Sequence, residues 1–352
     1  MKESYTGIGV MSGTSLDGLD IACIAFRYAN RKWSFSIQDA RTYPYPQRWK
    51  KGLTTFHHLL PSRFIELHND YGKYIGTRIN EFLKRSKLQP EFIASHGHTL
   101  MHQPDKNYTF QLGSGASIAA VTNIKTISDF RTLDVALGGQ GAPLVPIGDE
   151  QLFSGYDYLL NLGGFANISF KKNTDRLAYD ICPVNMALNY FAAKEEVPFD
   201  AAGKIGRSGK LLPDLFDHLQ TLEFYTRPGP KSLGKEWFEK YFLPPIVQKY
   251  FYVPDILHTV YQHIASVIGR ELVGKNKKCL VTGGGAHNTF LMELIQAHAE
   301  AEIVIPDKTL VDYKEALIFA YLGLLRLTNQ VNCLATVTGA RKDNIGGVIY
   351  EI

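Results

Sequence analysis

The sequence predicts an α/β protein of two domains with a mixed sheet in each. Three observations support this prediction. A chain of 352 residues is longer than one hydrophobic core usually supports. Strand-like and helix-like apolar segments alternate along it. Two apolar runs joined by a glycine-bearing turn occur near the start and again from residue 158, which suggests a duplicated core.

The first half opens with the predicted hairpin at 5–26, whose two apolar runs surround a polar loop. Apolar residues at helical spacing then predict one or two helices over 61–89. The next elements expected are a strand at 92–94, a helix at 115–121 and a strand at 124–128. The Gly/Pro cluster LGGQGAPLVP at 137–146 indicates a change of direction, and we place the domain crossing near it.

The second half repeats the design with a hairpin at 158–171. The elements expected after it are a strand ending at Asp180, a helix reaching 193, an irregular insertion at 224–252, a helix at 257–272, a strand at 279–282, and helices at 289–298 and 314–327.

Charge and cysteine content exclude several classes of protein. The 38 basic and 34 acidic residues give a net charge of +4 without a block of one sign, which does not indicate a nucleic-acid or membrane surface. No apolar run reaches the roughly 18 residues of a membrane span, and no signal-peptide pattern opens the chain. Scattered cysteines in apolar settings predict reduced, buried thiols and a cytoplasmic protein. They are Cys23, Cys182, Cys279 and Cys333.

The loop MSGTSLDG at 11–18 has the composition of a phosphate-binding turn. Gly13 and Gly18 permit tight backbone geometry, and successive amides would form an anion site. Hydroxyl donors come from Ser12, Thr14 and Ser15. Asp17 would hold Mg²⁺, which prefers oxygen ligands. The alternative is a polar hairpin turn, which the same residue types favour.

Two more glycine-rich turns would complete a nucleotide site. The first, NLGGFANI, offers Gly163, Gly164 and Asn167 to phosphate; the second, VTGGGAHN, would lay Gly283, Gly284, Gly285 and Asn288 against the adenosine. The second is no dinucleotide fingerprint, because that motif needs a further glycine at position 288. Ordinary hairpin and strand-to-helix turns are the alternatives.

Polar residues at the ends of apparent strands supply candidates for the chemistry. Asp180 would act as a general base, and Arg131 would bind an anionic group of the substrate. The other candidates for substrate contact are His96, Gly97, Asn185 and Glu315. For each residue alone, capping or an ordinary ion pair is the competing interpretation.

In combination these motifs resemble the anhydro-N-acetylmuramic acid kinases over residues 9 to 338. The segments that carry the resemblance are MSGTSLDG, SHGHT, DFRTLDVALGGQGAPLVP, NLGGFANIS, YDICPVN, GPKSLGKEWF, VTGGGAHN and KEALIFAYLG. The resemblance implies a two-domain actin-like ATPase of ribonuclease H-like fold, with nucleotide and sugar in the interdomain cleft. The expected domains are residues 1–131 with 336–352, and residues 132–335.

The resemblance also implies an activity. With ATP and Mg²⁺, the enzyme would open the 1,6-anhydro ring of 1,6-anhydro-N-acetylmuramic acid and phosphorylate O6, which yields N-acetylmuramic acid 6-phosphate and ADP for peptidoglycan recycling and amino-sugar catabolism. Asp180 falls on the catalytic aspartate, and Arg131 and Glu315 fall on sugar contacts. Its partners would be these small molecules, without nucleic acid or membrane, and a homodimer stays open.

Some positions depart from the family pattern and leave alternatives open. His98 stands where the family usually has Gln, and Lys235 stands where it usually has Arg. Ser114 occupies a position where an acidic residue is common. Beside Asp180, Cys182 and Val184 replace smaller residues. A kinase for another anhydrosugar such as levoglucosan is one alternative. A non-catalytic ATP-binding module of the actin or Hsp70 type is the other.

Overall fold

The computed structural model describes residues 2–13, 16, 18–173, 175–227, 229 and 231–352. The chain forms two compact units, a first unit of Met1–Phe153 with Tyr313–Ile352 and a second unit of Ser154–Asp312. The sequence-based boundaries place 132–153 and 313–335 in the second domain, whereas these residues belong to the first unit. The tilted rings of Phe153 and Phe35 lie 5.4 Å apart between centroids, and those of Tyr321 and Phe26 lie 5.7 Å apart, so both segments pack onto the first sheet.

The sheet of the first unit has the strand order β12-β6-β4-β1-β2-β3, and β5 pairs with β4. Its strands are β1 (Ser4–Ser12), β2 (Gly18–Ala29), β3 (Lys32–Pro44), β4 (Phe92–Gln103), β5 (Tyr108–Leu112), β6 (Thr126–Ser128) and β12 (Val348–Tyr350). β1, β2 and β3 form an antiparallel meander, which confirms the first hairpin, whereas β4 runs parallel to β1 and β6 parallel to β4. β4 is much longer than expected, so residues 95–98 lie within the strand and not after it.

The sheet of the second unit has the order β11-β10-β7-β8-β9. Its strands are β7 (Tyr158–Leu162), β8 (Phe165–Lys172), β9 (Asp175–Pro183), β10 (Lys278–Thr282) and β11 (Glu302–Val304). β7, β8 and β9 again form an antiparallel meander, and β10 and β11 continue from β7 in parallel. The five strands β6-β4-β1-β2-β3 of the first sheet therefore have the same order and directions as the five strands of the second, which is the arrangement of a duplicated ribonuclease H-like core, and the first sheet adds β12 and β5. The predicted fold class is confirmed.

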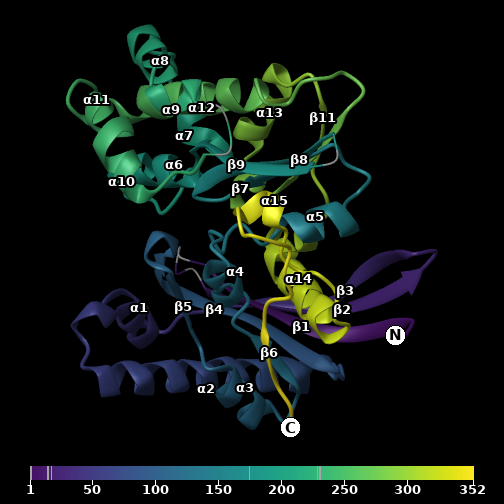
Figure 1. The fold of residues 1–352 in the computed structure, drawn as a ribbon. Helices are drawn as coiled ribbons and strands as arrows, with labels where there is room; N and C mark the ends of the chain where they lie inside the picture. The colour runs from purple at the N-terminus through teal and green to yellow at the C-terminus, as the bar shows by residue number, and fades with distance from the viewer. Residues whose placement is uncertain (1, 14–15, 17, 174, 228, 230) are drawn as a thin grey trace. The chain divides into compact units, whose positions relative to one another are not determined.

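Helices cover both faces of the first sheet (Figure 1). They are α1 (Gln47–Thr54), α2 (Pro61–Ser86), α3 (Gly115–Thr122), α4 (Thr132–Ala136), α5 (Pro146–Leu152), α14 (Lys308–Leu327) and α15 (Ala335–Thr338). One face packs against α2 through Tyr71, Ile75 and Ile79. The other face receives α14, which approaches β1 so closely that a Cβ on Gly9 would lie 1.8 Å from the carbonyl oxygen of Ala316.

The second unit has a large apolar core around the buried helix α12. Its helices are α6 (Asn185–Ala192), α7 (Lys204–Ser208), α8 (Pro213–Gln220), α9 (Glu223–Thr226), α10 (Lys235–Trp237), α11 (Pro244–Val247), α12 (Val253–Gly269) and α13 (Thr289–His298). The expected irregular insertion at 224–252 is built from short helical turns. The cysteines are all unpaired and buried, as predicted. Among the described residues, no helix has the length and apolar character needed to cross a membrane.

Candidate functional site

The first predicted phosphate turn connects β1 to β2. Thr14, Ser15 and Asp17 lie outside the described residues. Ser12 ends β1, and its side chain is 2% exposed. Its Oγ lies 2.8 Å from Nδ1 of His98 and accepts hydrogen bonds from the hydroxyls of Tyr45 at 2.7 Å and Tyr71 at 3.0 Å. The Ser12 hydroxyl, which was predicted to face phosphate, is therefore hydrogen-bonded inside the first unit. At this turn, the backbone of Ser12 and Gly13 is the part that would contact a phosphate.

His96 and Arg131 are brought together by neighbouring strands. His96 lies in β4, and Arg131 follows β6, which pairs with β4. Nε2 of His96 accepts from Nε of Arg131 at 3.1 Å and from Nη2 at 3.0 Å, and Nη1 of Arg131 donates to the carbonyl oxygen of Gly141 at 2.5 Å. Burial and the adjacent guanidinium lower the pKa of His96 well below its usual value, so the ring is neutral.

The guanidinium of Arg131 is half-buried and stays a cation. Burial lowers the pKa of Arg131 to about 10, while the negative charge of Glu315 opposes this change. Glu315 lies on α14, and its side chain is exposed. Next to it, Lys314 forms a buried ion pair of 2.8 Å with Asp149 of α5. Arg131 and Glu315 therefore form an electrostatically coupled pair of opposite charges in the first unit.

In the second unit, the turn Gly163-Gly164 connects β7 to β8 and has open space above it. A Cβ on Gly164 would meet nothing within 4 Å, and one on Gly163 would have its nearest neighbours at 3.6 Å. The carbonyl oxygen of Gly164 accepts from the backbone N–H groups of Val184 and Met186 at 2.8 and 3.1 Å, which fixes the turn against the start of α6. Packing does not require glycine at these two positions, so the open space suits the close approach of a ligand.

The third glycine-rich turn lies beside the second because β10 runs parallel to β7. Gly283 has φ +84°, and a Cβ there would lie 2.4 Å from Oδ1 of Asn161, so this glycine is required by the fold. Gly284 is open, with only Nδ2 of Asn185 at 3.7 Å from its Cβ position, whereas a Cβ on Gly285 would collide with Leu162. Gly284 thus extends the open surface above Gly163 and Gly164.

Asn185 and Asn288 both make structural hydrogen bonds. Nδ2 of Asn185 donates to the carbonyl oxygen of Leu162 at 3.1 Å, which joins α6 to the Gly163-Gly164 turn. Asn288 is the N-cap of α13: its Oδ1 accepts from the N–H of Leu291 at 3.1 Å, and its Nδ2 donates to the hydroxyl of Tyr261 at 2.7 Å. The side chain of Asn288 is thus already engaged on both sides.

Asp180 lies in β9 opposite Asn167 of β8, and Asn167 is also opposite Asn161 of β7. Partners in register project from the same face of a sheet, so these three polar side chains form a row beside the glycine turns. One carboxylate oxygen of Asp180, Oδ2, accepts from the N–H of Leu233 at 2.8 Å. Burial raises the pKa of Asp180 to about 6, and this hydrogen bond opposes the rise. Such a carboxylate is suited to general-base catalysis near neutral pH.

Two buried aspartates organise the glycine-rich segments, and the sequence analysis did not single them out. Asp134 accepts from the N–H of Gly141 at 2.8 Å and from the side chains of Thr338 and Asn344, both at 2.9 Å. Asp200 accepts from the N–H groups of Ile205 and Gly206 at 2.8 and 2.9 Å, and it lies beside Asn288. An acidic residue a few positions before a glycine is the signal that would have indicated such loop anchors.

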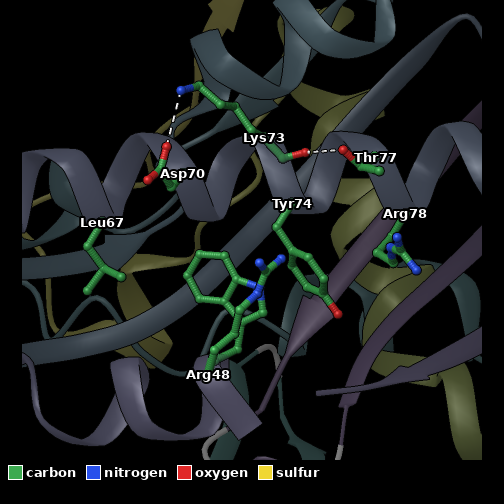
Figure 2. A pocket seen from close by; sticks show the side chains of 8 residues that line it. Arg48, Leu67, Asp70, Lys73, Tyr74, Thr77 and Arg78 are labelled. Atoms are coloured by element: carbon green, nitrogen blue, oxygen red, sulfur yellow. Dashed lines mark hydrogen bonds and ion pairs between the residues drawn. The ribbon is translucent and has the colours of Figure 1, made fainter. Parts of the chain in front are cut away.

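A separate surface pocket of about 480 Å³ lies between α1 and α2 (Figure 2). It is lined by Arg48, Trp49, Leu67, Asp70, Lys73, Tyr74, Thr77 and Arg78. Figure 2 shows Lys73 paired with Asp70, at 3.1 Å, on the exposed side of α2. None of the predicted site residues lines this pocket.

The predicted metal ligand Asp17 is outside the described residues. Within the described part of the chain, no three His, Cys, Asp or Glu side chains gather as they would around a metal ion.

Comparison with known families gives a match over almost the whole chain. The model of the family described as anhydro-N-acetylmuramic acid kinase matches residues 5–352. The anhydro-N-acetylmuramic acid kinase of Vibrio cholerae is 35% identical over 371 residues, which cover 99% of each chain. The protein of the same name from Sulfurovum sp. is 35% identical over 99% of each chain, and that of Legionella pneumophila (strain Corby) is 32% identical over 98% of each.

Similarities to solved structures are more distant. An activator of 2-hydroxyisocaproyl-CoA dehydratase from Clostridium difficile, with bound ADPNP, is 15% identical with a TM-score of 0.42 and covers 92% of this chain and 97% of its own. Glucokinase from Parabacteroides distasonis is 11% identical with a TM-score of 0.32 and covers 92% and 98%.

Proposed function

The chain belongs to the anhydro-N-acetylmuramic acid kinase family, and from this we infer that it is an enzyme that phosphorylates 1,6-anhydro-N-acetylmuramic acid with ATP in cell-wall recycling and amino-sugar catabolism. The identity of 35% over 99% of the chain supports the assignment to a kinase and argues against a non-catalytic module. We propose a cytoplasmic location, because the inferred reaction uses ATP.

The proposed reaction has two coupled bond exchanges. Asp180 takes a proton from a water molecule while the oxygen of that water attacks the anomeric carbon of the sugar. The bond between this carbon and O6 then breaks. The freed O6 then attacks the γ-phosphorus of ATP, and the bond to the leaving ADP oxygen breaks. The protonated Asp180 returns its proton to solvent. The pKa of about 6 supports Asp180 in this role, because the group is largely deprotonated at neutral pH and still basic enough to accept a proton.

The open surface above Gly163, Gly164 and Gly284 is the observation that supports nucleotide binding at these turns. Backbone groups at such a surface approach phosphate closely and supply fixed dipoles at the point where charge develops. Asn167 extends this surface toward Asp180, and Asn288 and Gly285 hold the turn beside it. Arg131 and Glu315, with Gly97, are the proposed sugar contacts. Asp17 is the proposed ligand of Mg²⁺, which would neutralise phosphate charge when bound.

The substrate is tested by measuring ADP release with 1,6-anhydro-N-acetylmuramic acid and with levoglucosan. We expect turnover with the first sugar and little with the second. Equal turnover on both would make the enzyme a general anhydrosugar kinase, and ADP release that does not depend on either sugar would contradict the proposal.

The nucleotide surface is tested by Gly164→Ala. We expect the KM for ATP to rise about tenfold with unchanged thermal stability, because the new methyl group projects into the ligand's space and meets no protein atom. Gly155→Ala is the matched control: its Cβ position is equally open, and it precedes β7 away from the turn. Equal KM values for the two variants would contradict a phosphate site at this turn.

A further inference from the structure

His96 has no ring nitrogen left for a ligand. Its Nδ1 lies 2.9 Å from the carbonyl oxygen of Gly97, which can only accept, so Nδ1 carries the proton. Nε2 is then the acceptor, and both Nε and Nη2 of Arg131 donate to it. The ring is 5% exposed and lies against Phe319 in a tilted contact, at 4.6 Å between centroids. Its place in the chain predicts a sugar contact, but its hydrogen bonds are all within the protein.

The guanidinium held by His96 keeps two N–H groups that none of the described residues accepts. His96 takes the edge formed by Nε and Nη2, and Gly141 takes one proton of Nη1. One N–H on Nη1 and one on Nη2 remain without a partner among the described residues. A guanidinium binds the two oxygens of a carboxylate through N–H groups on two of its nitrogens.

The charge of Arg131 has no counter-ion in contact. No carboxylate of the described residues lies within ion-pair distance of it, and Glu315 and Asp134 influence it only from farther away. A half-buried cation without a contacting anion is costly unless a ligand completes the pair. The neighbouring backbone is built to hold the arrangement: Gly97 has φ +72°, and a Cβ there would lie 2.5 Å from the carbonyl oxygen of Leu112.

We propose that His96 is a positioning residue that, as the neutral Nδ1–H tautomer, fixes Arg131 so that its remaining N–H groups on Nη1 and Nη2 bind the carboxylate of the sugar's lactyl group. The proposal rests on the proposed function, since it assigns one group of that substrate to one residue. His96 then acts on sugar selectivity through Arg131 and has no part in phosphoryl transfer.

The test compares two sugars that differ in the carboxylate, 1,6-anhydro-N-acetylmuramic acid and 1,6-anhydro-N-acetylglucosamine, by calorimetric Kd and by KM. His96→Leu removes the acceptor for Arg131. We expect it to weaken binding of the muramic sugar roughly 10- to 100-fold and binding of the glucosamine sugar less than about twofold, with an unchanged KM for ATP. His96→Gln places an amide oxygen near the position of Nε2 and is expected to restore most of the affinity.

Arg131→Lys provides a second variant that leaves His96 in place. It keeps the charge but lacks the paired N–H groups, so the same selective loss is expected. A loss of affinity that is equal for both sugars, or a His96→Gln variant that behaves like His96→Leu, would overturn the inference. Direct binding separates this outcome from failure of the proposed function, which would appear as absent ADP release although the wild-type protein binds the sugar.

Discussion

At the scale of single residues, the structure gives Asp180 an environment that differs from that of an ordinary surface aspartate. Burial raises the pKa of its carboxyl group to about 6, and among the described residues one of its oxygens is held, by the N–H of Leu233. Its pKa in the folded protein is therefore above the usual value of 3.8. The group is protonated, and useless as a base, over a range of mildly acidic pH where an exposed aspartate would still be ionised.

This environment predicts the pH dependence of the reaction. We expect kcat/KM to be level above pH 7 and to fall by about tenfold per pH unit below pH 6, since only the deprotonated carboxylate accepts the proton of water. The measurement is kcat/KM for the sugar from pH 5 to 8. Asp180→Asn should lose turnover at every pH while it still binds ATP. A level profile down to pH 5, or near-normal turnover of this variant, would remove Asp180 from the mechanism.

The sequence predicted residue types at the site better than it predicted their partners. Asp180 and the glycine turns were predicted as site residues from motifs, because glycine and strand-end carboxylates are local signals. Ser12, His96 and Asn288 were predicted as ligand contacts, yet their side chains bond to Tyr71, Arg131 and Tyr261. These partners are distant in sequence. Tertiary packing therefore decides which hydroxyl or amide groups remain available to a ligand, and a short motif carries no information about that packing.

At the scale of elements, a buried hydroxyl cluster joins the first hairpin to its neighbours. Ser12 ends β1, His98 lies in β4, Tyr71 lies in α2, and Tyr45 precedes α1. Tyr45 and Tyr71 are also 2.7 Å apart at their hydroxyls. Burial lowers the pKa of His98 to about 4, so the cluster is uncharged at neutral pH. The start of the turn between β1 and β2 is thus anchored to a helix as well as to the sheet.

The anchor predicts unequal effects of two similar variants of α2. Tyr71→Phe removes the hydroxyl that bonds to Ser12 and Tyr45, and we expect it to lower the free energy of unfolding by about 1–2 kcal/mol. Tyr74→Phe is the control, because the hydroxyl of Tyr74 has no hydrogen bond with the described residues, and it should change stability by less than about 0.5 kcal/mol. Urea unfolding of both variants is the measurement; equal losses would contradict the role of the cluster.

Among the elements, both hairpins were predicted from alternating apolar runs and glycine turns, and both are present. β4 was predicted too short because its second half, from Ser95 onward, is polar. It remains a strand because pairing with β1 and β5 satisfies its backbone. The helix expected at 314–327 begins earlier, at Lys308. Polar strands and polar first turns of helices carry weak periodicity, so tertiary pairing decides their ends.

At the scale of the whole molecule, the two units differ in how the chain builds them. The second unit is one continuous segment, and its sheet and core cluster lie entirely within Ser154–Asp312. The first unit needs two segments, because α14 covers one face of its sheet and β12 pairs with β6. The sequence-based boundary near residue 131 differs from this division, because a Gly/Pro cluster indicates a turn but not the unit to which the turn belongs.

This difference predicts the behaviour of fragments. We expect residues 154–312 alone to unfold cooperatively, because they keep their whole sheet and core. Residues 1–153 alone should show no cooperative transition, because they lack α14 and the edge strand β12. Circular dichroism during thermal unfolding tests both fragments. Cooperative unfolding of residues 1–153, or the absence of an unfolding transition in residues 154–312, would show that the two units are not independent folding units.

The late position of α14 and β12 also has a consequence for synthesis on the ribosome. Most strands of the first sheet emerge from the ribosome first. The helix that covers one face of this sheet begins only after residue 307, and the edge strand β12 is at residues 348–350. The second unit is complete while the first still exposes the apolar face that α14 later covers. The earliest-made part of this protein is therefore the last to be finished, and during that interval it is the part most exposed to aggregation and most in need of a chaperone.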